Sequence, residues 1–176
     1  FRRVLFRSPM LDKAFKQFLT DVDWGELDYL IVDMPPGTGD AQLTMIQATD
    51  VSGGVIVTTP QEVALLDGRK GLAMFQQMNV PVLGFVENMS YFQPPGSEER
   101  FDIFGTGGGR KSAGLAEEYN VPFLGEIPLD TRIREGGDCG KPVVASDPDS
   151  AVARAFTEVA KQVAANISIQ TLAPVS

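Results

Sequence analysis

Hydrophobic and polar positions change along the chain in blocks typical of alternating helices and strands. Apolar residues recur at three- and four-residue spacing over 9–22 and 60–78, the pattern of amphipathic helices. Between such blocks lie short aliphatic runs, several rich in β-branched residues, which are typical of buried strands. The pattern predicts strands at 28–33, 54–58, 80–86 and 122–127, and helices at 9–22, 40–47, 60–78, 111–119, 131–135 and from Asp147, as cap, to about 163.

This order of elements predicts an α/β fold with a parallel sheet flanked by helices on both faces. Strands separated by helices of this length form βαβ units, whose crossovers are almost always right-handed. Residues 87–109 are polar, rich in Gly and Pro and poorly periodic, so we expect a functional or mobile loop there. Residues 166–176 are expected to form a flexible, frayed tail.

Composition narrows the class of protein. The 176 residues, 43% hydrophobic and 22% charged, are ordinary for one soluble globular domain. A net charge of −8 without a basic stripe argues against nucleic acid as a partner, and no apolar run approaches the ~20 residues of a membrane span. The absence of His excludes His-based catalysis and His metal sites, and one Cys excludes an internal disulfide and fits a reducing cytoplasm. We therefore expect a cytoplasmic protein with neither nucleic acid nor membrane as partner.

The first eight residues differ in composition from the rest. They carry three of the 15 Lys and Arg residues and no initiator Met. A basic presequence is one interpretation, but a signal peptide needs a longer apolar segment and a small-residue cleavage site. We interpret 1–8 as a non-native leader, followed by the domain at 9–165.

Candidate chemistry begins at Asp33, which ends the apolar run 27–32 and leads into a Gly/Pro loop that reaches Asp40. A carboxylate at the carboxyl end of a parallel strand lies where open α/β sheets bind ligands. Such a carboxylate can hold Mg²⁺ through water, while amides of Gly37 and Gly39 meet a γ-phosphate. A strand-ending Asp in a tight Pro-Gly turn, without a ligand, is the alternative.

Six segments together resemble a known family, the Mrp/ApbC-type ATPases, which are iron–sulfur cluster carriers of the deviant-Walker P-loop class. The resemblance covers residues 9 to about 165 and implies a P-loop NTPase (Rossmann-like) fold. It also implies ATP and Mg²⁺ as cofactors, a homodimer, and transfer of iron–sulfur clusters to apoproteins. The segments are 33–40, 58–64, 84–92, 103–109, 124–130 and 140–143.

The resemblance assigns roles to individual residues. Asp33 is implied as the Walker B carboxylate that holds Mg²⁺ through water, and Gly37 as part of the switch loop. Asn88 is implied to hydrogen-bond the adenine edge, since an amide supplies both a donor and an acceptor. Pro128 and Asp130 are implied to line the other side of the base. The alternative for Asn88 is a turn residue that bonds to its own backbone.

The sequence departs from the family at the phosphate site. Members carry an N-terminal strand and a Gly-rich Walker A loop with two lysines before the Walker B carboxylate, and this chain lacks both. Residues 105–112 are one residue from the P-loop pattern but follow Asp33, and we interpret them as a flexible loop that starts a helix. We therefore expect ATP hydrolysis by the intact protein and negligible hydrolysis by this chain alone.

A second departure concerns the cluster. Many members have a Cys-x-x-Cys pair where this chain reads Gln-Pro-Pro-Gly at 93–96. The single Cys139 lies elsewhere, and two copies of the chain supply only two sulfurs where a cluster takes four. No cluster ligand is identified.

Two other functions remain open. A partitioning ATPase of the ParA/MinD type shares the fold but should carry a basic amphipathic C-terminal helix, and 149–163 has only Arg154 and Lys161 as cations. A non-catalytic, partner-binding fragment with an adenine-side half-pocket is the third interpretation. The leading hypothesis is an ATP-dependent iron–sulfur cluster carrier.

Overall fold

The computed structural model describes residues 9–34, 40–105 and 110–172. These residues divide into two compact units, 1–51 and 52–176, and each unit is described by itself.

The first unit contains two contacting helices, α1 (Pro9–Thr20) and α2 (Asp40–Ala48). Both match the predicted helices within two residues. An irregular segment follows α1, and the indole Nε1 of Trp24 donates a hydrogen bond of 2.9 Å to the carbonyl oxygen of Phe18. This bond folds the segment back onto the end of α1.

The predicted buried strand at 28–33 is wrong. Residues 28–33 have no regular secondary structure, and Ile31 is 79% exposed. A strand needs a neighbour for its N–H and C=O groups, and the described residues of this unit contain no strand for it to pair with. The apolar side chains of this run are therefore exposed: Leu27, Tyr29, Leu30, Ile31 and Val32.

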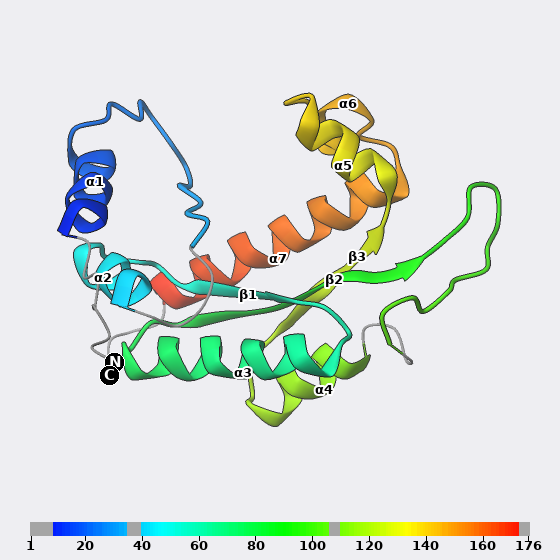
Figure 1. The fold of residues 1–176 in the computed structure, drawn as a ribbon, viewed down its shortest axis with the longest axis horizontal. Helices are drawn as coiled ribbons and strands as arrows, with labels where there is room; N and C mark the ends of the chain where they lie inside the picture. The colour runs from blue at the N-terminus through cyan, green and yellow to red at the C-terminus, as the bar shows by residue number, and fades with distance from the viewer. Residues whose placement is uncertain (1–8, 35–39, 106–109, 173–176) are drawn as a thin grey trace, which may run out of the picture. The chain divides into compact units, whose positions relative to one another are not determined.

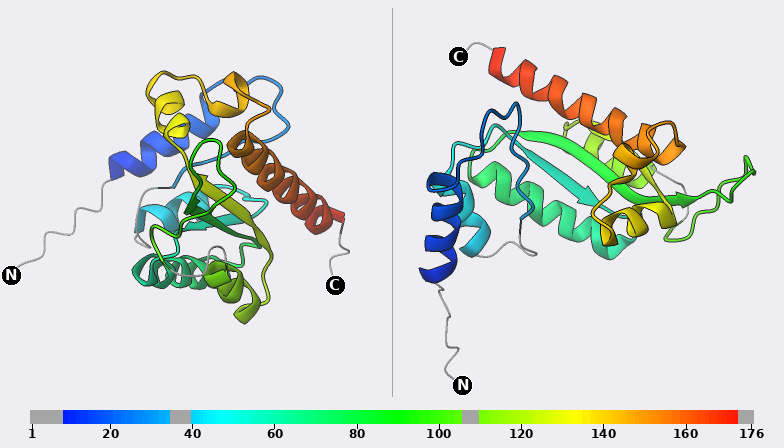
Figure 2. Two further views of the ribbon diagram at one scale, coloured as in Figure 1. Left: turned by 90° about the vertical axis from the view of Figure 1, so that its right-hand side faces the viewer. Right: turned by 90° about the horizontal axis from the view of Figure 1, so that it is seen from above.

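The second unit is built on a three-stranded parallel sheet in the order β1-β2-β3 (Figure 1). Helices α3 and α4 cover one face of this sheet and the long α7 covers the other, as Figure 2 also shows. This arrangement confirms the predicted parallel sheet with helices on both faces. The elements are β1 (Gly54–Thr58), α3 (Glu62–Gln77), β2 (Val82–Phe92), α4 (Arg110–Glu118), β3 (Phe123–Leu129), α5 (Thr131–Asp138), α6 (Val143–Ser146) and α7 (Ala151–Leu172).

The core lies on both faces of the sheet. On one face, Val86, Leu124 and Ile127 pack against α7 through residues such as Val159. On the other face, Phe85 is fully buried beside Gly68 of α3. Alternate strand residues thus supply the two hydrophobic layers that a parallel sheet requires.

Strand β2 is longer than predicted. It continues to Phe92, so the first six residues of the loop predicted at 87–109 belong to the strand. Phe92 and Phe101 exchange two backbone hydrogen bonds of 2.8 Å in an antiparallel bridge, which closes the loop between them. The Gly/Pro content of 93–96 therefore marks the turn of this excursion.

Helix α7 begins later and ends later than predicted. Ser150 caps it, because the Ala153 amide donates to Ser150 Oγ at 3.2 Å, so the prediction of Asp147 as the cap is wrong. The helix continues through 166–172, where a frayed tail was expected. Asn166 anchors this part to the sheet by donating from Nδ2 to the Leu83 carbonyl oxygen at 2.9 Å. Across the described part of the chain, no helix is long and apolar enough to cross a membrane.

Candidate nucleotide-binding site

The carboxyl ends of β2 and β3 bring two of the candidate residues together. Asn88 on β2 is the register partner of Ile127 on β3, and Pro128 follows Ile127 directly. Pro128 is buried and Asn88 is half-buried. The structure thus places an amide side chain and an apolar ring on neighbouring strands at the edge where parallel sheets bind ligands.

Asn88 bonds to nearby backbone, as the alternative interpretation predicted, but it does so at an irregular point inside strand β2. Its Oδ1 accepts a hydrogen bond of 2.9 Å from the Met89 amide, and Met89 has a φ of 51°, in the left-handed region. An Asn amide has two donors and two acceptor lone pairs. The bond to Met89 uses one acceptor position and so orients the amide without using its donors.

Asp130 follows the end of β3 and caps α5. Its Oδ1 accepts from the Arg132 amide at 2.9 Å, and its Oδ2 lies 2.6 Å from Nη2 of Arg132. Arg132 also pairs with Asp147 at 3.0 Å. The hydrogen bond from Arg132 lowers the pKa of Asp130, and the same contact raises the pKa of Arg132. The candidate residue is therefore also the anchor that fixes the start of α5.

The strand ends described above belong to the second unit, whereas Asp33 and Gly37 belong to the first. Asp33 is an exposed residue of the first unit, at the end of the irregular segment. Gly37 lies outside the described residues. Their roles on the phosphate side thus stay predictions.

A buried carboxylate beside Asn88 was not singled out from the sequence. Glu87 is fully buried, and its Oε2 accepts from Ser112 Oγ at 2.5 Å and from the Ser112 amide at 3.2 Å. Its Oε1 accepts from Ser90 Oγ at 2.7 Å. The signal available in the sequence was a charged residue inside an otherwise apolar run, which is rarely tolerated in a core without partners.

A second carboxylate lies next to Glu87. Glu126 of β3 is the register partner of Glu87, which is itself the partner of Thr58 on β1. Burial raises the pKa of Glu126, and the neighbouring Glu87 raises it further, while Arg100 acts in the opposite direction. Thr58, Glu87 and Glu126 therefore form a row of polar side chains across the three strands, one position before Asn88.

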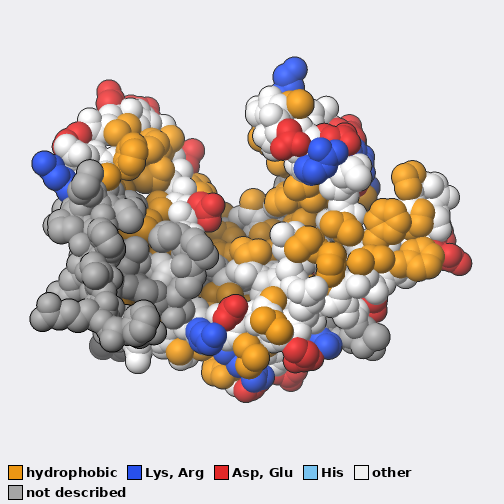
Figure 3. Space-filling model, viewed as in Figure 1, with side chains coloured by type: hydrophobic (Ala, Val, Ile, Leu, Met, Phe, Trp, Pro, Cys, Tyr) orange, Lys and Arg blue, Asp and Glu red, His pale blue; other side chains and the backbone are white. Residues whose placement is uncertain are grey.

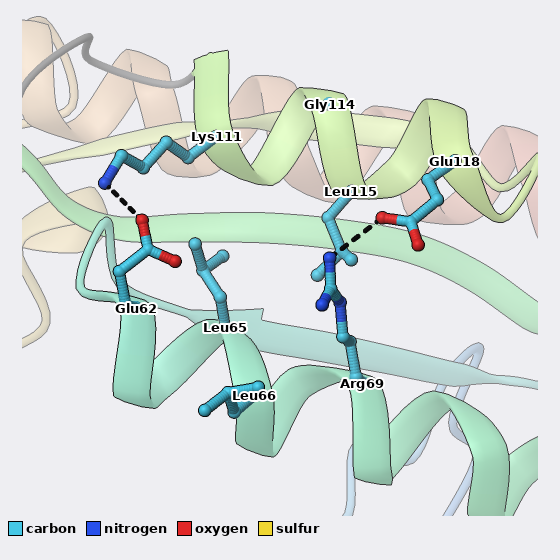
Figure 4. Close-up of a pocket in the computed structure, with 8 residues that line it drawn as sticks. All are labelled: Glu62, Leu65, Leu66, Arg69, Lys111, Gly114, Leu115 and Glu118. Atoms are coloured by element: carbon cyan, nitrogen blue, oxygen red, sulfur yellow. Dashed lines mark hydrogen bonds and ion pairs between the residues drawn. The ribbon is translucent and has the colours of Figure 1, made fainter.

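A groove of about 270 Å³ lies between α3 and α4 (Figure 4). Leu65 and Leu115 are among its lining residues. Two ion pairs link the helices, Glu62–Lys111 at 2.7 Å and Arg69–Glu118 at 2.9 Å. The hydrogen bond from Lys111 lowers the pKa of Glu62. Among the described residues that line this groove there is none of the candidate site residues.

The surface carries mixed charge along these two helices. Figure 3 shows acidic and basic side chains interspersed over α3 and α4 on the face that it presents. The ion pairs of the groove and the Lys70–Asp67 pair on α3 account for part of this alternation.

The chain has one thiol, that of Cys139, as a candidate ligand for an iron–sulfur cluster. Cys139 is exposed and is the C-cap residue of α5. Within the described ranges, no group of three or more Cys, Asp or Glu side chains is placed to hold a metal ion. The donor set of this chain, one thiolate, does not fit a cluster held by four cysteine sulfurs.

The parallel sheet with helices on both faces defines a domain of the α/β class. Residues 2–164 match the family model described as "ParA: NUBPL iron-transfer P-loop NTPase". The chain belongs to this family, and the resemblance identified from the six sequence segments is confirmed.

Curated relatives agree with this assignment. The chain is 59% identical over 170 residues to the iron–sulfur cluster carrier protein of Synechocystis, a match that spans 96% of this chain and 47% of the relative. It is 49% identical over 160 residues to the iron–sulfur cluster transfer protein NUBPL of Mus musculus, spanning 91% and 49%. The chain thus spans about half the length of the curated relatives it matches.

Solved structures show the same fold. A nucleotide-binding protein from Archaeoglobus fulgidus in complex with ADP matches with a TM-score of 0.68 and 41% identity, over 80% of this chain and 56% of that chain. The cell division ATPase MinD of Pyrococcus furiosus matches with a TM-score of 0.60 and 26% identity, over 88% and 57%. The P-loop NTPase fold is thereby confirmed.

Proposed function

We propose that this chain forms the switch and adenine-side part of an ATP-dependent iron–sulfur cluster carrier. The protein would act in the cytoplasm as a homodimer and transfer clusters to apoproteins. The observation that carries the proposal is the 59% identity to an iron–sulfur cluster carrier over nearly the whole chain. The placement of Asn88 and Pro128 on neighbouring strand ends supports the nucleotide part.

On the adenine side, the residues present fit a purine. Asn88 is oriented by its bond to Met89 and offers amide donors to a base edge, while buried Pro128 offers an apolar surface to the ring. Asp130 lies two residues after Pro128, and its contact with Arg132 holds its carboxylate at the start of α5. These three residues would bind and orient the adenine.

On the phosphate side, we propose Asp33 and Gly37 as the residues that bind Mg²⁺ and respond to the γ-phosphate. The exposed carboxylate of Asp33 has the chemistry of a ligand for hydrated Mg²⁺, because Mg²⁺ retains several waters and takes few carboxylates. Gly37 would lie in the loop that responds to the γ-phosphate. ATP with Mg²⁺, when bound, supplies the hydrolysis free energy that a switch loop converts into movement.

The cluster is the cargo of such a carrier. Since the chain offers one thiolate, a complete set of four cysteine ligands does not come from one copy or from two. We derive no ligation step from the residues of this chain, and the carrier assignment rests on its relatives.

Adenine binding is tested by titrating the purified chain with a fluorescent ADP analogue and competing with unlabelled ADP or GDP. Asn88→Ala should weaken ADP binding about tenfold, since it removes a hydrogen-bonding amide from a half-buried site. Asn120→Gly is the matched control, because Asn120 is a turn residue at a φ of 53° that Gly adopts without strain. Equal affinity of the Asn88→Ala variant and the unchanged chain, or no preference for ADP over GDP, would refute the adenine site.

Cluster carriage is tested by anaerobic reconstitution with iron and sulfide, read by visible absorbance, followed by incubation with an apo-ferredoxin. Retained iron that passes to the acceptor would support carriage, with the remaining ligands supplied from outside this chain. The Cys139→Ser variant tells whether the single thiolate takes part. A chain that retains no cluster and loads no acceptor contradicts carriage by this part of the protein.

The partitioning alternative has less support. The MinD structure from Pyrococcus furiosus is 26% identical to this chain, against 41% for the nucleotide-binding protein from Archaeoglobus fulgidus. Helix α7 carries Arg154 and Lys161 as its only cations, so it lacks the basic face that binds anionic membranes. Sedimentation with anionic vesicles distinguishes the two, because a partitioning ATPase of the MinD type should sediment with them.

A further inference from the structure

The Glu87 carboxylate joins three parts of the sheet edge. It lies on β2 directly before Asn88 and is fully buried. Ser90, two residues beyond Asn88, donates to one of its oxygens, and Ser112 donates both its hydroxyl and its amide to the other. One side chain therefore connects β2, the irregular segment 88–90 within β2 (called the Asn88 turn below) and the first turn of α4.

The hydrogen bonds to the Glu87 carboxylate fix the positions of the groups that donate them. Carboxylate oxygens accept hydrogen bonds, and the two hydroxyls and the amide named above all donate to Glu87. The Ser112 amide belongs to the first turn of α4, where unpaired N–H groups and the helix dipole favour an anion. Hydrogen bonds to a charged acceptor are short and strong, and in a buried site they fix orientation.

Asn88 lies within this set of hydrogen bonds. The bond between Glu87 and Ser90 closes a short loop of chain around Asn88 and Met89, and Met89 occupies the left-handed φ region. Residues in such backbone conformations persist where their surroundings hold them there. The carboxylate is the group that holds both ends of this loop.

We propose that Glu87 is a positioning residue, which holds the turn from Asn88 to Ser90 at a fixed place relative to α4 and thereby presents the Asn88 amide to the nucleotide. The nucleotide part of this inference rests on the proposed function. The mechanical part, coupling of the turn to α4 through one carboxylate, does not.

The test compares three substitutions in the purified chain. Glu87→Gln keeps the shape but replaces one acceptor oxygen by a donor amide, and Ser112→Ala and Ser90→Ala each remove one donating hydroxyl. The two Ser variants remain informative if Glu87→Gln does not fold. Ser168→Ala is the matched control, since Ser168 is an exposed helical Ser on α7 that bonds only to its own helix backbone.

Amide hydrogen exchange gives the first readout. We expect Glu87→Gln and Ser112→Ala each to speed exchange at least tenfold both at 88–92 and at 112–116, while Ser168→Ala changes neither. Ser112→Ala must affect the turn at Asn88, although Ser112 lies on another element. Faster exchange confined to α4, with the turn unchanged, would overturn the proposal.

A spectroscopic titration separates the role of the charge from simple packing. Because Glu87 contributes to the raised pKa of Glu126, Glu87→Gln should lower the pKa of Glu126, read from its carboxyl ¹³C shift. Ser112→Ala keeps the charge and should leave the Glu126 titration nearly in place. An unchanged Glu126 titration in Glu87→Gln would contradict the placement of the Glu87 carboxyl group that the proposal uses.

Nucleotide affinity completes the test. Glu87→Gln should raise the Kd for the ADP analogue at least fivefold, as a misplaced Asn88 would, whereas Ser168→Ala should not. If the unchanged chain binds no ADP, the proposed function fails, and the exchange data still decide whether Glu87 couples the turn to α4. If the chain binds ADP and Glu87→Gln binds equally well, the positioning role is refuted and the proposed function stands.

Discussion

The Asp130 carboxylate lies 2.6 Å from Nη2 of Arg132 and 2.9 Å from the backbone nitrogen of the same residue. One side chain thus caps α5 and pairs with a charge on its first turn. The pair is partly exposed, so solvent screens the charge, and the cap is the larger contribution to stability.

We predict that Asp130→Ala lowers the free energy of unfolding by about 1 kcal/mol, as loss of an N-cap does. Asp130→Asn should lose less, because Asn is a good N-cap and forfeits only the ion pair. Urea unfolding at neutral pH measures both. Equal losses in the two variants would mean that the ion pair, and not the cap, stabilises α5.

The same contact predicts a pH dependence. The folded-state pKa of Asp130 is lowered by Arg132, so its stabilisation is full above the usual Asp pKa of about 3.9 and is lost as pH falls through the lower folded value. The stability difference between the unchanged chain and Asp130→Asn should therefore shrink as acid is added. A difference that stays constant down to pH 2 would contradict a lowered pKa.

For Glu126 we predict a pH dependence of stability opposite in sign to that of Asp130. Its folded-state pKa is raised by burial and by Glu87, so the carboxyl group costs stability as pH rises from the usual Glu value of about 4.3 through the raised value. Glu126→Gln should stabilise the protein at pH 7 and have no effect below about pH 4. Glu62→Gln is the control of opposite sign, since Lys111 lowers the pKa of Glu62. The measurement is urea unfolding across pH, and a gain for Glu126→Gln that persists in acid would be inconsistent with a raised pKa.

The pattern of apolar positions predicted most of the second unit because strand and helix periods there match the final packing. Strand β1 was predicted at its observed bounds, and α3 within two residues. The segment 28–33 has an equally good strand pattern but no partner strand among the described residues of its unit, and pairing is not a local property. Intrinsic strand preference therefore predicted an element that the described contacts do not support.

The candidate site likewise contains residues that the sequence predicted and residues that it did not. Asn88 and Pro128 were predicted from a family resemblance, which encodes a tertiary arrangement that local periodicity does not contain. Glu87 was overlooked because its partner Ser112 is 25 residues away, across the excursion after β2. Ser150 displaced Asp147 as a helix cap because both residue types cap well, and only the backbone geometry chooses between them.

Leu→Ala substitutions at a buried and at an exposed position of α3 distinguish the contribution of core packing to stability from that of helix propensity. Leu72 is fully buried and Leu66 is 53% exposed. Leu72→Ala should lower the free energy of unfolding by about 2–5 kcal/mol, through lost burial and a cavity, while Leu66→Ala should change it by about 0.5 kcal/mol or less. Denaturant unfolding measures both. A large loss in Leu66→Ala would indicate that its side chain is covered in solution.

Gly→Ala substitutions at a crowded and at an open position provide a second comparison. Gly84 has a φ of 146°, and a Cβ there would lie 2.4 Å from the Pro122 carbonyl oxygen, where β2 meets β3. Gly84→Ala should therefore cost more than the ~1–3 kcal/mol of the backbone strain alone. A Cβ at Gly71 in α3 meets nothing within 4 Å, so Gly71→Ala should stabilise the helix by about 0.5–1 kcal/mol. Thermal unfolding of both variants checks the signs, and a destabilised Gly71→Ala would contradict the open space beside α3.

The exposed apolar run at 27–32 predicts self-association. Its residues combine high strand preference with exposure, and an unpaired strand-like segment is a template for pairing between chains. Ile31→Asp places a charge at its most exposed position and should shift the chain toward monomer in size-exclusion chromatography with light scattering over a range of concentrations. Gln17→Glu is the matched control, because it adds the same negative charge at an exposed polar position of α1 and leaves the run intact. If Gln17→Glu reduces association as much as Ile31→Asp, net charge and not the apolar run governs solubility. If neither variant alters association, the run does not mediate contact between chains, and the exposed side chains of 27–32 are tolerated in solution.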